Sequence, residues 1–478
     1  MSLLPPRGIS NPASFCYCNS VLQQLFRLPI LRKHILSFED ADLLEEQYSI
    51  LRELKNIFVQ LAVSDEEAVD PLLLAYTILD PRPYDDSDDD DDDHDNNSFE
   101  PIVKPPRTLD PDLEMDVSEF LSTFLTQLST AEERLATHRC SRLMRPLIQG
   151  QILNEHYQLP SNTDSGTLTG RVTLSTSVDQ FFYISLNVGE VPNRSWMQDT
   201  TTTDTGSNDS KRRPCVVLNT LEQSLAYFCS EERINCAWSA VTREGKGLTD
   251  GVSPSTCFRS TLVGDALPAH LLVHLKRFRF DHRKRKRIKL HDRLEFPMLL
   301  DVAAFTSDAS AAATTTAPTK TTTGITEDVY SVSSSSSSSS TLPMLYELSG
   351  VIVHRGSASK GHYYSLVRNS HQTGVLDGHN DGGDVASIDS DEWFKIDDAH
   401  VTVFDHVSDM DAVAFGGIQT PGSSSNNSKA NDENCESQPG DDINDGEGDD
   451  QPPPKAKKQN AFMLFYNRID TSHSLPCS

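Results

Sequence analysis

The 478-residue sequence predicts an α+β fold, in which helices come first along the chain and strands follow. Apolar residues at helical spacing gather in the first third of the chain, whereas later segments are short and rich in aromatic and β-branched residues. Polar, acidic or Ser/Thr-rich stretches separate these segments and carry too little apolar surface to offset chain entropy. We therefore expect one folded unit with disordered insertions rather than a βαβ repeat.

Three helices are expected in the first part of the chain. Residues 16–28 show the clearest pattern, because apolar side chains recur at helical spacing before Pro29, which should end the helix: Val21, Leu22, Leu25 and Leu28. Residues 48–62 and 112–128 also have helical periodicity. These segments predict a helical layer near the amino end.

Six later segments have the composition of strands: FFYISLNV, LPAHLLVHLKRFRF, YELSGVIVHRG, HYYSLVRN, EWFKIDD and AFMLFYNRI. The last of them, residues 461–469, follows the polar stretch 417–460. An isolated apolar strand would be prone to aggregation, so we expect it to return to the same sheet as the others.

A single domain is predicted for residues 1–469, followed by a short tail at 470–478. Disordered insertions are expected at about 84–98, 189–214, 303–343, 369–390 and 417–460, where acidic, Ser/Thr-rich or Gly/Asn-rich sequence dominates. The basic run RKRKRIK at 283–289 directly follows a predicted strand. A solvated hairpin turn is favoured there over a nuclear signal or a nucleic-acid patch, because the chain is acidic overall.

The composition excludes several classes of partner. The formal net charge of −28 opposes unaided binding to nucleic acid or to an anionic membrane, and it favours a cationic partner. No apolar run approaches the roughly 20 residues that span a bilayer, and the start MSLLPPRGIS lacks the apolar stretch of a secretion signal. The nine cysteines are scattered, so we expect reduced thiols in an intracellular protein, located in the cytoplasm and also able to be nuclear.

Two cysteines one residue apart, in NPASFCYCNSVLQQLFRLP, are candidates for a nucleophile. Cys16 lies where the predicted helix begins, so the free backbone N–H groups of the helix could stabilise its thiolate. Cys18 lies further into the helix and is rotated away. Both could equally be small buried apolar residues, which is the usual role of a free cysteine.

A catalytic thiol needs a base and a group that orients that base. His362 begins a predicted strand directly after Gly361, a residue that lets a substrate backbone approach closely. Asp397 and Asp398 end another predicted strand, where a carboxylate could hold the second nitrogen of an imidazole. His354 is a competing base, although a histidine inside a strand is more often structural.

These segments together resemble the ubiquitin-specific proteases. GISNPASFCYCNSVLQQLF resembles the cysteine box of that family, and LSGVIVHRGSASKGHYYSLVR followed by WFKIDDAHVT resembles its histidine box. Four further segments occur in the family's order: MDVSEFL, LPAHLLVHLKRFRFD, LEFP and AFMLFYNR. The FGG at 415–417 is similar to the fat-facets-like branch.

The resemblance implies a papain-like cysteine protease with the architecture of an open hand, in which a helical thumb, a β palm and β fingers surround the substrate. It implies that Cys16 is the nucleophile and His362 the general base and acid. It further implies that Asp397 orients His362, that Asp398 is a helper or substitute, and that Asn11 donates to the oxyanion. Cys18 matches a packing position and is expected to be structural.

The implied activity is hydrolysis of the (iso)peptide bond at the C-terminal glycine of ubiquitin, with ubiquitin and ubiquitinated proteins as partners and no cofactor. Asp116 and Glu119 lie three residues apart, hence on one helical face, and match positions that hold the arginines of the ubiquitin tail. Gly361 and Tyr363 are further expected contacts of the substrate. The catalytic domain is expected to be monomeric.

Departures from the family's sequence pattern keep two alternatives open. Ala13, Ser14 and Phe15 stand where glycine, asparagine and threonine are usual, so the oxyanion loop could be strained and slow. The alternatives are a ubiquitin-binding scaffold with weakened catalysis and a protease for a ubiquitin-like modifier. No CxxC pair occurs in the chain, so the zinc site of many relatives is not expected.

Overall fold

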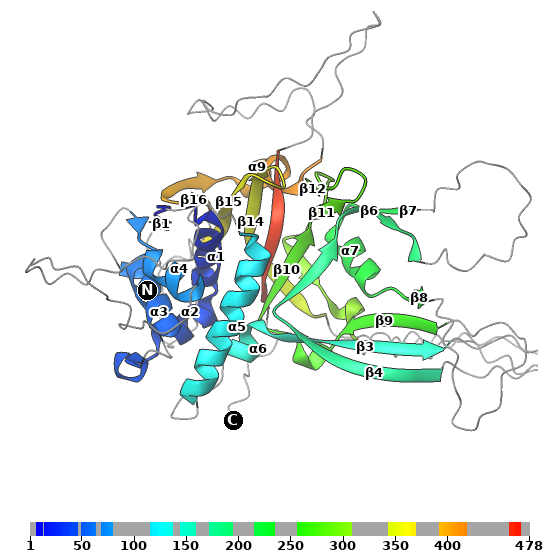
Figure 1. Ribbon diagram of the computed structural model, residues 1–478, viewed down its shortest axis with the longest axis horizontal. Helices are drawn as coiled ribbons and strands as arrows, with labels where there is room; N and C mark the ends of the chain where they lie inside the picture. The colour runs from blue at the N-terminus through cyan, green and yellow to red at the C-terminus, as the bar shows by residue number, and fades with distance from the viewer. Residues whose placement is uncertain are drawn as a thin grey trace, which may run out of the picture.

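A computed structural model gives the structure of the protein (Figure 1). The residues that it describes are 6–12, 14–45, 49–63, 68–79, 115–136, 144–158, 172–194, 215–234, 256–307, 343–369, 392–417 and 458–469. Most of the expected insertions and the expected tail at 470–478 lie outside these residues. Within them, no helix has the length and apolar character needed to cross a membrane.

An eight-stranded sheet forms the centre of the molecule (Figure 1). Its order is β17-β16-β15-β14-β18-β10-β5, and β13 pairs with β14. These strands are β5 (Tyr183–Asn187), β10 (His270–Lys276), β13 (Leu299–Asp301), β14 (Leu345–Gly356), β15 (Gly361–Asn369), β16 (Glu392–Asp397), β17 (His400–Phe404) and β18 (Gln459–Arg468). Since β18 pairs with both β14 and β10, the predicted return of the last strand to the sheet is confirmed.

A helical layer covers one face of this sheet (Figure 1). It consists of α1 (Cys16–Arg27), α2 (Pro29–Leu36), α3 (Ser49–Val63), α4 (Leu72–Leu79), α5 (Val117–Ala136) and α6 (Met144–Ile148). The helix predicted for residues 16–28 is confirmed, and its apolar residues are fully buried against the sheet and the other helices. Pro29 marks the first turn of α2, where its missing N–H is tolerated.

The central helix α1 is buried on all sides because its polar residues bond to backbone groups. The side chain of Gln24 donates to the carbonyls of Val351 and Leu366, at 3.1 and 3.0 Å, and so joins α1 to β14 and β15. The side chain of Gln23 donates to the carbonyl of Arg7 at 2.6 Å. Buried donors that find carbonyl partners in this way fix the position of a helix, because an unpaired donor would be costly.

A second sheet and several smaller elements lie on the other side of the molecule (Figure 1). The sheet has the order β4-β3-β9-β8 and contains β3 (Gly150–Gln158), β4 (Val172–Phe181), β8 (Glu232–Ile234) and β9 (Thr256–Leu262). The smaller elements are α7 (Leu221–Phe228) and the pairs β6 (Gly189–Pro192) with β7 (Cys215–Leu218), and β11 (Phe278–Asp281) with β12 (Lys286–Lys289). A two-residue pair, β1 (Gly8–Ile9) with β2 (Ala68–Val69), lies near the amino end, and α9 (His406–Met410) runs into a π-helical turn at Asp411–Phe415.

Several expected boundaries differ from the structure. Gly189–Pro192 were expected inside a disordered insertion, but they form β6, because they pair with β7 and bury Val191. Helix α5 begins at Val117 rather than near residue 112, and residues 101–114 lie outside the described residues. The basic run at 283–289 was predicted to be a solvated turn, and residues 283–285 do form the exposed turn between β11 and β12. Residues 286–289 are strand β12 itself, and Lys289 at its end is buried.

Candidate active site

The two residues expected to form the nucleophile and base meet at the junction of the helical layer and the sheet. Cys16 is the first residue of α1, and His362 is the second residue of β15. The thiol of Cys16 lies close enough to the imidazole to raise its pKa, although the residues are far apart in sequence. Cys16 is 5% exposed, so the sulfur is largely shielded from water.

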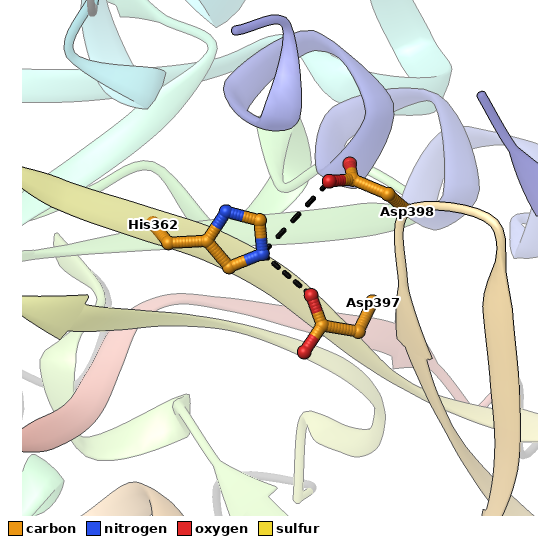
Figure 2. Close-up of side chains that lie close together, drawn as sticks. All are labelled: His362, Asp397 and Asp398. Carbon is orange, nitrogen blue, oxygen red and sulfur yellow. Dashed lines mark hydrogen bonds and ion pairs between the residues drawn. The ribbon is translucent and has the colours of Figure 1, made fainter. Parts of the chain in front are cut away.

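Asp397, the last residue of β16, holds the other side of the imidazole (Figure 2). Its Oδ1 lies 2.5 Å from Nε2 of His362, which leaves Nδ1 of the ring for the thiol. Burial disfavours the imidazolium, but the hydrogen bonds and negative charges of Asp397 and Cys16 outweigh it and raise the pKa of His362 to about 10. The same contact lowers the pKa of Asp397 to about 2 despite its burial. The pair is therefore charged at neutral pH.

Asp398 lies beside this pair but bonds to other side chains. Its Oδ2 is 3.9 Å from Nε2 of His362, which is beyond hydrogen-bond distance (Figure 2). Instead, Oδ2 accepts from Nδ2 of Asn11 at 2.8 Å and Oδ1 accepts from Nδ2 of Asn19 at 2.9 Å. Asp398 occupies the turn between β16 and β17 with φ +53, a conformation that aspartate tolerates better than most residues. Its carboxylate thus ties this turn to the segment before α1.

Asn11, the expected oxyanion donor, is held at both ends of its amide. Its Oδ1 accepts from the backbone N–H of Phe15 at 2.7 Å, and one N–H of Nδ2 donates to Asp398. Ser14 adopts φ +58, in the left-handed region that favours glycine or asparagine. The strain expected at Ala13 lies outside the described residues, and among the described residues of this loop it is Ser14 that is strained.

The competing thiol and the competing base are both buried away from this arrangement. Cys18 is fully buried, and burial followed by the charge of Cys16 raises the pKa of its thiol well above the ordinary value. His354 is 3% exposed, and burial lowers the pKa of its imidazole to about 3. Its ring packs against Phe278 and Tyr363. Both residues therefore have the surroundings of structural residues.

A family comparison agrees with this geometry. The family model described as "Ubiquitin carboxyl-terminal hydrolase" matches residues 7–466, which is nearly the whole chain. The chain belongs to the ubiquitin carboxyl-terminal hydrolase family. The recognition made from the sequence segments is therefore confirmed.

Curated relatives are distant and much longer than this chain. It is 25% identical to ubiquitin carboxyl-terminal hydrolase 47 of Drosophila melanogaster over 440 residues, covering 84% of this chain and 23% of the relative. It is 22% identical to human ubiquitin carboxyl-terminal hydrolase 24 over 477 residues, covering 98% of this chain and 14% of the relative. The chain thus spans less than a quarter of the length of either relative.

A solved structure supports the fold. The chain resembles a chain of a SAGA DUB module containing Ubp8, Sgf11, Sus1 and Sgf73 bound to monoubiquitin, with a TM-score of 0.53 and 16% identity. The match covers 98% of this chain and 70% of that chain. At this identity the likeness shows the α+β fold alone, which confirms the predicted fold class.

The two acidic residues expected to bind the substrate tail have different surroundings in this hydrolase-family chain. Asp116 precedes α5 and caps it, because Oδ1 accepts from the N–H and the hydroxyl of Ser118 at 2.9 and 2.8 Å. Its Oδ2 lies 3.4 Å from a guanidinium nitrogen of Arg287 on β12. Glu119 is exposed in the first turn of α5. Both carboxylates therefore lie at the amino end of α5, and their contact with a substrate tail stays a prediction.

Gly361 and Tyr363 flank His362 on β15 and contact protein on their inner side. A Cβ at Gly361 would fall 2.0 Å from Nε2 of His354. The packing of this ring therefore leaves room for glycine only. Tyr363 is 6% exposed, and its ring packs against those of His354 and Phe462. Both residues help to position the strand that carries His362, and their contact with substrate stays a prediction.

Among the residues that the structure describes, one group of three could offer metal ligands within 4.8 Å of one another: His362, Asp397 and Asp398. Their ligand atoms already have partners, because His362 bonds to Asp397 and Asp398 bonds to Asn11 and Asn19. The ammonium of Lys395 also lies 3.2 Å from Oδ2 of Asp397. A cation there would lie beside an ammonium and displace the imidazole. The surroundings of these three residues therefore fit a hydrogen-bonded network better than a metal site.

Three residues of the site were not predicted from the sequence. Asn19 bonds to Asp398, Lys395 pairs with Asp397, and Arg287 pairs with Asp116. A signal existed for Lys395, since it lies two residues before Asp397 in a predicted strand and hence on the same face. The contacts of Asn19 and Arg287 join distant parts of the chain and leave no such local pattern.

Proposed function

We propose that this chain is the catalytic part of a deubiquitinating cysteine protease. The reaction would be hydrolysis of the (iso)peptide bond that follows the C-terminal glycine of ubiquitin. The observation that carries the proposal is the convergence of Cys16, His362 and Asp397 from three separate elements, in the order thiol, imidazole, carboxylate. Membership of the hydrolase family supports the choice of ubiquitin as the substrate.

In the first half of the reaction, His362 takes the proton of Cys16 and the thiolate attacks the carbonyl carbon of the terminal glycine. The raised pKa of His362 supports an imidazolium that stays paired with the thiolate before attack. The carbonyl oxygen becomes an oxyanion, and Asn11 is suited to stabilise it, because the second N–H of its amide is not used by Asp398. Collapse of this intermediate breaks the C–N bond, and His362 gives its proton to the departing lysine amine.

In the second half, water attacks the thioester that joins Cys16 to ubiquitin. His362, now neutral, removes a proton from the water and returns it to the sulfur when the C–S bond breaks. Asp397 remains ionised throughout, since its pKa is near 2, and it stabilises each imidazolium that forms. The products are a free lysine amine, the carboxylate of ubiquitin and the regenerated thiol.

We propose that the acidic residues at the amino end of α5 bind the ubiquitin tail. Asp116 and Glu119 would attract the arginines that precede the two terminal glycines. Ubiquitinated proteins are the proposed partners. An intracellular location, in the cytoplasm or the nucleus, fits the reduced thiols. The SAGA DUB module described above is bound to monoubiquitin, which supports ubiquitin as a ligand here.

The strained φ of Ser14 favours one alternative, a ubiquitin-binding scaffold with slow catalysis. Ubiquitin that carries a C-terminal electrophile tests the two functions. The active protease should form a covalent adduct, whereas the scaffold should bind the probe reversibly. An adduct with a ubiquitin-like modifier but not with ubiquitin would instead favour a protease for that modifier.

Cys16→Ala and Cys18→Ala form a matched pair, because both cysteines are buried in the first turn of the same helix. The first substitution should abolish the adduct, and the second should leave it. His362→Gln should slow adduct formation by roughly the 10²- to 10⁴-fold typical of a lost general base. An adduct that persists in Cys16→Ala would contradict the proposed nucleophile.

A further inference from the structure

Lys395 pairs with the carboxylate that holds the catalytic imidazole. It lies on β16 two residues before Asp397, so the two side chains share one face of the strand. Its Nζ is 3.2 Å from Oδ2 of Asp397, and the side chains are 32% and 23% exposed. The contact is thus partly shielded from water, unlike an ordinary surface ion pair.

The two oxygens of Asp397 are divided between two partners. Oδ1 bonds to Nε2 of His362 at 2.5 Å, and Oδ2 faces the ammonium of Lys395. A carboxylate held at one oxygen alone can turn about its terminal torsion, since that torsion is broad. The second contact opposes this rotation and therefore keeps Oδ1 directed at the imidazole.

The ammonium itself rests on a fixed surface. Its Nζ lies 4.6 Å from the centroid of the Tyr364 ring, in the geometry of a cation–π contact. Tyr364 is 1% exposed, and its hydroxyl donates to Oε1 of Gln459 on β18 at 3.0 Å. A buried ring that is anchored at its far end limits the positions open to Lys395.

Other charged or titratable groups near Asp397 come from every neighbouring element. His362 faces it from β15, Asp398 follows it in the turn, and His400 is its cross-strand partner on β17. Of these, His362 and Lys395 are the groups whose contacts lower the pKa of Asp397 against the effect of burial. Lys395 therefore differs from His362 in facing the outer oxygen of Asp397, Oδ2, while His362 bonds to Oδ1.

We propose that Lys395 is a positioning residue of this site: its ammonium holds Oδ2 of Asp397, so that Oδ1 stays on Nε2 of His362. It acts through Asp397 rather than by contact with the thiol. The inference rests on the proposed function for its catalytic consequence. Its geometric part concerns the state of His362 and can be measured without any substrate.

The test compares Lys395→Met with Lys395→Arg in the full chain. Lys33→Met is the matched control, because Lys33 is an exposed lysine of α2 and loses the same charge. The substrate is a fluorogenic amide of the ubiquitin C-terminus. In Lys395→Met, kcat should fall about three- to tenfold with KM little changed. Lys395→Arg should recover most of this loss, and Lys33→Met should behave like the wild type.

The pKa of His362, measured by NMR on histidine-labelled protein, distinguishes two roles of Lys395: positioning of Asp397, or only a positive charge near His362. The His362 signal is assigned from its loss in His362→Gln. If Lys395 were only a nearby positive charge, its removal would raise the pKa of His362. If Lys395 positions Asp397, the weakened hydrogen bond should lower that pKa in Lys395→Met, and Lys395→Arg should restore it.

A pKa of His362 that rises or stays unchanged in Lys395→Met would overturn the inference, and so would a kcat within twofold of the wild type. Failure of the proposed function would look different, because the wild type itself would not cleave the ubiquitin substrate. The NMR titration would still decide the positioning role in that case.

Discussion

The buried pair of His34 and Glu132 should contribute strongly to the stability of the helical layer. Nε2 of His34 lies 2.6 Å from Oε1 of Glu132, and the two side chains are 6% and 1% exposed. Both oxygens of Glu132 also accept from the N–H of Met144, at 3.2 and 3.0 Å, where α6 begins. One carboxylate thus joins α2, α5 and α6.

Glu132→Ala removes all of these contacts at once. It leaves a buried imidazole and a helix-terminal N–H without their acceptor, and each unsatisfied buried group costs about 1–3 kcal/mol. The sum of these two effects is about 2–6 kcal/mol. We therefore expect the free energy of unfolding, measured in urea, to fall by about 2–6 kcal/mol.

Glu133→Ala is the control, because Glu133 is the next residue of α5 but is 36% exposed, where it pairs with Arg145. That pair is screened by water, so its loss should cost no more than about 1 kcal/mol. The double variant His34→Ala/Glu132→Ala should cost less than the sum of the single changes, since each removes the same contact. Equal losses for Glu132→Ala and Glu133→Ala would refute the reasoning.

Three further outcomes follow from the site. Arg287→Gln frees Asp116 for the substrate, so KM for the ubiquitin amide should fall by no more than about fivefold, and only at low salt; a higher KM would contradict this. Gly361→Ala forces a Cβ against His354, so activity should drop about 100-fold while the fold survives in circular dichroism. The pKa of His362 is raised to about 10, so this residue stabilises the fold fully below its ordinary value of 6.5 and progressively less toward pH 10. The urea stability of the wild type relative to His362→Gln should therefore decline across that range, and a constant difference would speak against the raised pKa.

The elements that could be predicted from sequence are those whose side chains show a regular burial pattern. Helix α1 and strands β14, β15 and β18 are buried along most of their length, so apolar periodicity and composition mark them. Strand β4 escaped prediction because its side chains are exposed from Thr173 to Gln180, including Leu174 and Val178. Its pairing with β3 comes from backbone hydrogen bonds, which leave no hydrophobic pattern in the sequence.

One predicted strand is two strands in the structure, and the side chain of Arg277 between them explains the division. The segment LPAHLLVHLKRFRF divides between Lys276 and Phe278, where β10 ends and β11 begins. The intervening Arg277 is fully buried, and its guanidinium donates to the backbone carbonyls of Ala461, Leu290 and Asp292: Nε to Ala461 at 2.6 Å, and Nη1 to the other two at 3.3 and 2.9 Å. An arginine in an apolar run therefore marks a junction of chain segments here, which composition alone does not reveal.

The candidate site shows the same division between local and distant causes. The place of Cys16 at the start of a helix is a local property, and the periodicity of residues 16–28 predicted it. The approach of His362 to Cys16 is not local, because it depends on the hydrogen bonds from Gln24 that join α1 to β14 and β15. From the residues alone, the preference for His362 over His354 was weak, and the resemblance to a family strengthened it.

The site is thus held by polar side chains that bond across segments distant in sequence. Gln24 fixes α1 on the sheet, and Asn19 and Asn11 fix the turn at Asp398 beside that helix. Each of these residues lies in the same short segment as Cys16, so one stretch of chain carries both the thiol and the groups that align it with the strands. Substitution of Asn19 should therefore disturb the alignment without touching the thiol, the imidazole or the carboxylate that bonds to it.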